Sequence, residues 1–201
     1  MSNNYIYQGL IACAHERPEQ IAVEELVSGK TITFGELLQL IDAGVTFLDT
    51  HHYPDTVVIL ANMGIETVVT YYAVVSSGRT AAMIDDDFDS PHGVTLKTKF
   101  PDLCVNPYDF VTNLSKVVRP DKTMRHVPVA NEVESVLFTS GSTGEPKIFG
   151  IPNARIRLEY QVLPGHDEKE YTVLNVRRPS STPFRVNLQR AFLNNGRFIL
   201  V

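Results

Sequence analysis

The sequence predicts an α/β fold with a largely parallel sheet flanked by helices. Residues 56–61 and 80–84 are short apolar runs typical of buried strands, and residues 65–75 between them form an apolar helical segment. A strand, a helix and a second strand at this spacing indicate a βαβ unit with parallel strands. The chain has 201 residues, 43% of them hydrophobic, enough for a substantial core. No repeat or clear linker interrupts it, so we expect residues 1–201 to form a single α/β subdomain without an internal boundary.

The N-terminal residues predict a helix followed by a hairpin. Residues 5–14 carry apolar side chains at helical spacing, and Pro18 should follow the end of this helix. Residues 21–25 alternate like a strand, and residues 31–34 are the expected returning arm after a Ser-Gly turn.

The second helix has a clear start signal. Thr33 and Glu36 fit a capping box, in which the hydroxyl and the carboxylate satisfy amides of the first turn. This helix should run to about Thr50, and the βαβ unit follows it. Ser77 and Gly78 are expected to end the helix of that unit.

The second half of the chain gives weaker local signals. Residues 87–132 contain five prolines and short apolar runs, from which we expect one or two short strands and a short helix. The later elements are expected to be a strand at 134–138, a hairpin arm at 148–151, a helix at 154–162, a strand at 171–176, a helix at 184–193 and a final strand at 197–201.

Composition and charge argue against several kinds of partner. The net charge is −5 with the six histidines taken as neutral, so no basic excess indicates nucleic acid or an anionic membrane. No apolar run approaches the ~20 residues needed to cross a bilayer, and the first residues lack the regions of a secretory signal. Cys13 and Cys104 are interpreted as small buried hydrophobic residues. We expect a cytoplasmic protein with no nucleic-acid and no membrane partner.

No metal site is expected from the sequence. The histidines form no i,i+4 pair or finger spacing. The acidic run 85–87, with Asp89, does not fit an EF-hand, because Ser90 and Leu96 stand where that loop needs glycine and glutamate.

The most informative tract reads Thr-Ser-Gly-Ser-Thr-Gly-Glu-Pro-Lys from Thr139 to Lys147. Hydroxyls donate hydrogen bonds, glycines let the backbone approach an anion closely, and a lysine supplies a compensating charge. The pattern therefore predicts a polyphosphate-binding loop. Its candidate phosphate-binding residues are Thr139, Ser140, Gly141, Ser142, Thr143, Gly144 and Lys147.

This tract differs from the common nucleotide loops. A Walker loop needs Gly-x-x-x-x-Gly-Lys before a helix, whereas Gly141 and Gly144 are three residues apart and Pro146 precedes the lysine. It is not the dinucleotide Gly-x-Gly-x-x-Gly either. From Phe138 to Lys147 it resembles, almost residue for residue, the phosphate loop of the adenylate-forming superfamily. That superfamily includes acyl- and aryl-CoA synthetases, adenylation domains of nonribosomal peptide synthetases and firefly luciferase.

Weaker similarities to the same superfamily extend along the chain. Residues 14–23 resemble its opening segment, and residues 32–37 its Thr-Tyr-x-Glu-Leu helix start. Residues 71–84, with Ser77-Gly78 and a strand that reaches Asp85, are similar to its helix, glycine and Pro-Leu-Asp-Pro region. Residues 192–201 are similar to the start of the strand that follows its Leu-Leu-x-Gly-Gly segment. The resemblance covers essentially all 201 residues and implies the first subdomain of the adenylate-forming fold.

The resemblance implies an adenylation reaction. In that superfamily a substrate carboxylate attacks ATP-Mg²⁺ to give an acyl-adenylate and pyrophosphate, and a thiol of CoA or a carrier protein usually takes the acyl group next. The residues from Thr139 to Gly144 would wrap the β- and γ-phosphates, and Lys147 would screen the charge that grows on the leaving pyrophosphate. The implied cofactors are ATP and Mg²⁺, and the implied substrate is a carboxylic acid of unspecified structure.

The chain also departs from the superfamily. The later elements that hold Mg²⁺, the ribose and the reacting carboxylate have no counterpart, so no catalytic residue is assignable and the Mg²⁺ ligands lie outside this chain. Ile148 replaces the usual glycine after the lysine. Residues 181–184 align with the Phe-Asp-x-Ser segment of amino-acid activators but lack its aspartate, which argues against an ordinary α-amino acid substrate.

Three interpretations remain open. The chain is the N-terminal part of an adenylating enzyme, completed by further residues or by a complementing C-terminal half; it is a degenerate relative that binds a nucleotide or a partner without chemistry; or it is a scaffold without nucleotide binding. The intact loop favours the first, with the chain alone nearly inactive. A chain ending on strand 197–201 is expected to leave a sheet edge or an apolar face for such a half to cover.

Overall fold

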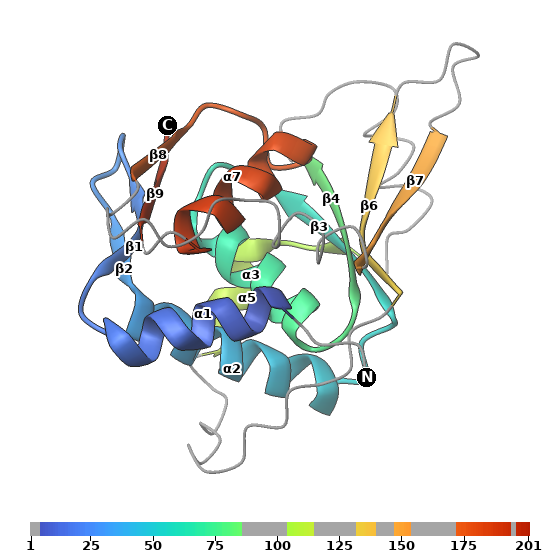
Figure 1. The fold of residues 1–201 in the computed structure, drawn as a ribbon. Coiled ribbons are helices and arrows are strands. Elements are labelled where there is room, and N and C mark those ends of the chain that lie inside the picture. The colour runs from blue at the N-terminus through green and yellow to red at the C-terminus, as the bar shows by residue number, and fades with distance from the viewer. Residues whose placement is uncertain (1–4, 86–103, 115–131, 140–146, 154–171, 194–195) are drawn as a thin grey trace.

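The fold is α/β, with strands in two sheets and helices packed between them (Figure 1). The computed structural model describes residues 5–85, 104–114, 132–139, 147–153, 172–193 and 196–201. The described helices are α1 (Tyr5–Glu16), α2 (Phe34–Thr50), α3 (Ile65–Ser76), α5 (Pro107–Leu114) and α7 (Thr182–Leu193). The strands are β1 (Ile21–Glu25), β2 (Thr31–Thr33), β3 (Thr56–Ala61), β4 (Thr80–Asp85), β5 (Cys104–Val105), β6 (Val133–Thr139), β7 (Lys147–Pro152), β8 (Thr172–Asn175) and β9 (Arg197–Leu200).

These elements confirm the α/β class and most of the predicted boundaries. The short strand and helix expected between residues 87 and 132 correspond to β5 and α5. The helix predicted at 154–162 lies outside the described residues. The division of the strands between two sheets is a feature that the sequence did not indicate.

The five-stranded sheet has the order β5-β3-β4-β6-β7. Strands β3, β4, β5 and β6 run parallel, as predicted for the βαβ unit, and β7 returns antiparallel to β6. The four-stranded sheet has the order β2-β1-β9-β8, in which the β1–β2 hairpin is antiparallel and β1, β9 and β8 are parallel. Among the described strands, β9 is therefore central and β2 and β8 are the edges, so residues 197–200 do not form the sheet edge that was expected there.

Helix α3 connects the two sheets physically. It contacts β3 and β4 of one sheet and β1 of the other, and α2 and α5 pack beside it (Figure 1). Eleven of its twelve residues are buried, which explains why its sequence is apolar on all sides rather than on one stripe. Val57 and Ile59 of β3 belong to the same large buried core as the α3 side chains. Val58 belongs instead to a smaller buried cluster, with Ala82 and Ile84, on the opposite side of the sheet.

The predicted start of α2 is confirmed in detail. The backbone N–H of Glu36 donates to Thr33 Oγ1 at 3.2 Å, and the backbone N–H of Thr33 donates to Glu36 Oε2 at 2.9 Å. These reciprocal bonds satisfy amides that the first helical turn leaves without partners. The helix then presents Leu37, Leu38 and Ile41 to the core.

Both cysteines are reduced, and their surroundings differ. Cys13 is buried, as interpreted from the sequence, and its thiol donates to the carbonyl oxygen of Phe192 at 3.1 Å. Burial raises the pKa of the Cys13 thiol to about 11, so it stays protonated near neutral pH. Cys104 is only partly buried. In the described part of the chain, no helix is long and apolar enough to cross a membrane.

Candidate functional site

Strands β6 and β7 position the two ends of the predicted phosphate loop. Their antiparallel register pairs Thr139 with Lys147, Phe138 with Ile148 and Leu137 with Phe149. The first and last candidate phosphate-binding residues therefore stand opposite each other at the end of a hairpin. The candidates between them, Ser140, Gly141, Ser142, Thr143 and Gly144, lie outside the described residues.

The hairpin emerges at the carboxyl edge of the parallel strands. Strand β6 pairs in parallel with β4 through Ala81–Ser135 and Ala82–Val136, so both strands end at the same edge. Val136 and Phe138 of β6 pack against a buried cluster that contains Ala82 and Ile84. Ligands of open α/β sheets bind outside the carboxyl ends of the strands. The backbone positions of Thr139 and Lys147 are thus those of a ligand-binding edge.

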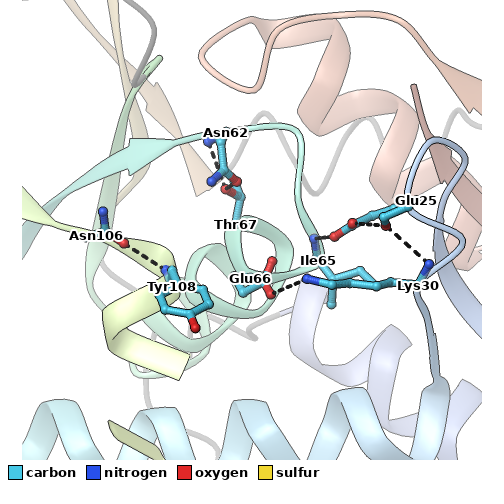
Figure 2. Close-up of polar contacts among 9 residues, drawn as sticks. Glu25, Lys30, Asn62, Ile65, Glu66, Thr67, Asn106 and Tyr108 are labelled. Carbon is cyan, nitrogen blue, oxygen red and sulfur yellow. Dashed lines mark hydrogen bonds and ion pairs between the residues drawn. The ribbon is translucent and has the colours of Figure 1, made fainter. Parts of the chain in front are cut away.

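Two asparagines that follow the neighbouring strands β3 and β5 form hydrogen bonds within the chain at the starts of helices (Figure 2). Asn62, after β3, accepts a hydrogen bond from Thr67 Oγ1 through its side-chain oxygen at 3.0 Å. Asn106, after β5, accepts from the backbone N–H of Tyr108 at 2.9 Å and so caps α5. These asparagines stabilise the starts of α3 and α5.

The β1–β2 hairpin is attached to the start of α3 by two carboxylates (Figure 2). Glu25 Oε1 accepts from the backbone N–H of Ile65 at 2.8 Å, where the helix dipole favours a negative charge. Lys30 Nζ lies 3.4 Å from Glu66 Oε1. The negative charge of Glu66, and to a smaller extent that of Glu25, raises the pKa of the Lys30 ammonium.

A cavity of about 640 Å³ lies beside this attachment. Helices α2, α3 and α5 contribute apolar lining residues such as Leu40, Val69 and Leu114, and Lys30 and Glu66 belong to the lining. None of its described lining residues belongs to β6 or β7, so this cavity is distinct from the predicted phosphate site.

The segment before α7 reaches the same edge as the hairpin. Asp85, the last residue of β4, accepts hydrogen bonds from the backbone and side chain of Ser180. The segment aligned with Phe-Asp-x-Ser, residues 181–184, therefore begins beside β4, and Phe184 points into the core with no exposed surface. The sequence placed Asp85 in an acidic run and at the end of the segment similar to Pro-Leu-Asp-Pro, but it did not predict the contact with Ser180.

A buried polar cluster supports the beginning of β6. Glu134 accepts hydrogen bonds from the hydroxyls of Tyr71 and Ser135, and its Oε2 lies 3.8 Å from Arg185 Nε. Arg185 also donates from Nη1 to Gln189 Oε1 at 3.2 Å. Burial, together with the Glu134 carboxylate, raises the pKa of the Tyr71 hydroxyl, so it is protonated and donates. This cluster joins α3, β6 and α7 and was also missed from the sequence.

Within the described residues, no group of three or more His, Cys, Asp or Glu side chains is arranged to hold a metal ion. Asp86, Asp87 and Asp89 of the acidic run lie outside that part of the chain. The expectation that the Mg²⁺ ligands lie elsewhere stays a prediction.

Comparison with solved structures defines the class of fold. The N-terminal subdomain of Klebsiella oxytoca NpsA, in complex with 3-hydroxyanthranilyl-AMSN, superimposes with a TM-score of 0.77 at 16% sequence identity. The match covers 97% of this chain and 52% of that structure. The chain has the fold of the N-terminal subdomain of adenylate-forming enzymes, as the sequence resemblance implied.

Curated sequences place the chain near the same enzymes. D-alanine--D-alanyl carrier protein ligase of Lactiplantibacillus plantarum is 29% identical over 152 residues, which are 67% of this chain and 29% of the ligase. Nonribosomal peptide synthetase kk1B of Curvularia clavata is 26% identical over 157 residues, 69% of this chain and 1% of the synthetase. No family model matches the chain. These relatives are adenylate-forming enzymes, and this chain matches less than a third of the length of either.

Proposed function

We propose that the chain is the N-terminal part of an adenylate-forming ligase, in which it supplies the loop that binds the ATP phosphates. The whole enzyme would activate a carboxylic acid to an acyl-adenylate and release pyrophosphate. The observation that carries the proposal is the β6–β7 hairpin, which places Thr139 opposite Lys147 at the carboxyl edge of a parallel sheet. The sequence between them supplies the hydroxyls and glycines that a polyphosphate requires.

The residues present fit the triphosphate part of the nucleotide. A hairpin end with paired strands fixes where the chain leaves and re-enters the sheet, so the two ends of the predicted phosphate loop are already held together before an anion binds. Bound Mg²⁺ would neutralise charge that grows on the leaving pyrophosphate. Lys147 would add a second positive charge near the same oxygens.

The proposed partners follow from the share of its relatives that the chain matches, 29% of the carrier protein ligase and 1% of the synthetase. We propose that ATP and a carboxylic acid bind between this subdomain and a C-terminal half, either further residues of the same protein or a separate polypeptide. CoA or a carrier protein would accept the acyl group, in a cytoplasmic setting. The missing aspartate at residues 181–184 favours an acid without an α-ammonium group.

Replacing Lys147 with alanine tests the phosphate role directly. We expect ATP affinity to fall about 10-fold or more, because a hydrogen bond to a charged group contributes about 1.5–3 kcal/mol. Titration calorimetry with ATP measures the change. Lys30→Ala is a matched control, since it removes the same charge from an exposed ion pair that contributes little. Equal ATP affinity in the Lys147→Ala and unmodified chains would remove Lys147 from the site.

ATP–pyrophosphate exchange separates the alternative functions. We expect the chain alone to bind ATP without exchange, and to support exchange with a panel of carboxylic acids only when a C-terminal half is supplied. ATP binding that never leads to exchange, even with such a half, would instead support a degenerate nucleotide-binding or partner-binding module. A folded chain with no ATP binding would support the scaffold.

A further inference from the structure

Asp85 lies where β4 ends beside the strand that carries the predicted phosphate loop. It is buried, with 4% of its side chain exposed. Strand β4 pairs with β6 through Ala82 and Val136, and Ile84 belongs to the cluster against which Phe138 packs. Continuing this register along both strands brings Asp85 level with Thr139. A buried carboxylate at this edge needs partners, because an isolated buried charge is unfavourable.

Ser180 supplies two of those partners. Its backbone N–H donates to Asp85 Oδ1 at 3.0 Å, and its hydroxyl donates to Asp85 Oδ2 at 2.6 Å. Bonds to an ionised acceptor are stronger than neutral ones. Figure 1 shows the consequence for the fold, in which α7 begins beside the arrowhead of β4. We call this pair of bonds the Asp85–Ser180 latch.

The latch also fixes a tight turn that contains Arg178. The backbone N–H and the hydroxyl of Ser181 both donate to the carbonyl oxygen of Arg178, at 3.0 and 2.6 Å. Arg178 Nη1 lies 3.8 Å from Asp85 Oδ2, which is an ion pair longer than a hydrogen bond. The Arg178 side chain is 62% exposed. This exposed side chain lies beside Asp85, at the edge where β4 ends next to β6.

We propose that Arg178 is a second cation for the nucleotide polyphosphate and that the Asp85–Ser180 latch positions it. This inference rests on the proposed function. A planar guanidinium binds phosphate oxygens in a bidentate manner, which suits it better than lysine to orient a leaving pyrophosphate. Asp85 restricts the guanidinium to one side of the turn, so less side-chain entropy is lost when an anion binds.

Affinities for ATP, pyrophosphate and AMP measure the role of Arg178. In Arg178→Ala we expect ATP and pyrophosphate to bind about 10-fold to 100-fold more weakly, as expected for a lost bond between charged groups, and AMP within about twofold of the unmodified chain. Arg177→Ala is the matched control, because it removes the same charge from the neighbouring exposed residue. An Arg178→Ala chain that binds ATP normally, or loses ATP and AMP equally, would overturn the assignment.

Asp85→Asn tests the latch, because the two possible roles of Asp85 predict opposite changes in ATP affinity. If Asp85 acted only as a nearby negative charge, its removal would strengthen ATP binding. We expect weaker binding, because an amide has one acceptor oxygen and the turn loses its anchor. Stronger or unchanged binding would overturn the positioning role.

Ser180→Ala keeps that role testable if Asp85→Asn fails to fold. It should weaken ATP binding in the unmodified chain and have no further effect when combined with Arg178→Ala, because both changes act on one interaction. Additive effects would contradict the latch.

The variants also distinguish failure of this inference from failure of the proposed function. If Lys147→Ala weakens ATP binding and Arg178→Ala does not, only this inference fails; if the folded, unmodified chain binds no ATP, the proposed function fails with it.

Discussion

Glu134 and Arg185 show how single residues connect the candidate site to the core. Both side chains are 2% exposed, and they join helix α7 to the strand that leads to the predicted phosphate loop. Two buried charges lose much of their hydration, so their pair stabilises the protein only modestly relative to an apolar replacement. Removing one partner is different, because the other remains buried as an uncompensated charge.

Glu134→Ala should therefore lower the free energy of unfolding by about 3–5 kcal/mol, the usual effect of breaking a buried ion pair. The double variant Glu134→Leu with Arg185→Met should recover most of this loss, since neither charge remains. Urea denaturation of both variants measures the difference. A double variant no more stable than Glu134→Ala would show that the pair makes a large net contribution of its own.

The candidate site was predictable from sequence only where its signal is local. The tract from Thr139 to Lys147 lies within nine residues, so local pattern alone was enough to predict a phosphate-binding role for it. Glu134 and Arg185 are far apart in the chain, as are Asp85 and Ser180, and a long-range contact leaves no periodicity or motif. Their partnership becomes visible only when the strands and α7 are placed.

At the scale of elements, the same distinction explains which predictions succeeded. The start of α2 is encoded within four residues by Thr33 and Glu36, and its boundary was predicted correctly. The central position of β9 depends on parallel pairing of Val23 with Phe198, across most of the chain. Local pattern predicts that residues 197–200 form a strand but not which strands flank them.

Gly44 sets the distance between α2 and α3. A Cβ atom added there would lie 2.6 Å from Ala73 Cβ and 3.2 Å from the ring of Phe110. Gly44→Ala would gain about 1 kcal/mol from helix propensity. We expect a net loss of stability instead, because overpacking of a close helix contact costs about 1–3 kcal/mol.

Thermal and urea unfolding of Gly44→Ala test this contact. The second change Ala73→Gly should restore part of the lost stability, because it removes the atom against which the new Cβ collides. A Gly44→Ala chain as stable as the unmodified one would mean that α2 and α3 can separate at little cost.

For the whole molecule, the arrangement of α3 between two sheets predicts one cooperative unit. Glu25 of the four-stranded sheet caps the helix that packs on the five-stranded sheet, and one buried core includes side chains from both. We therefore propose that the two sheets fold together as the single subdomain expected from the sequence. Independent folding would require the α3 interface to separate, which would expose a helix buried on nearly every side.

Phe198→Ala tests this cooperativity from the centre of the four-stranded sheet. Phe198 has no exposed surface and packs edge-on against Phe184, with ring centroids 5.5 Å apart, so its truncation should cost about 3–5 kcal/mol. In native-state hydrogen exchange, we expect the most protected amides of β3 and β4 to lose as much protection as those of β1 and β9, because both sets exchange through one global opening. Leu174→Ala, at an exposed position of β8, should change protection by less than about 0.5 kcal/mol. Loss of protection confined to β1 and β9 would show instead that the two sheets open separately, and the β6–β7 hairpin would then belong to a unit that opens independently of β9.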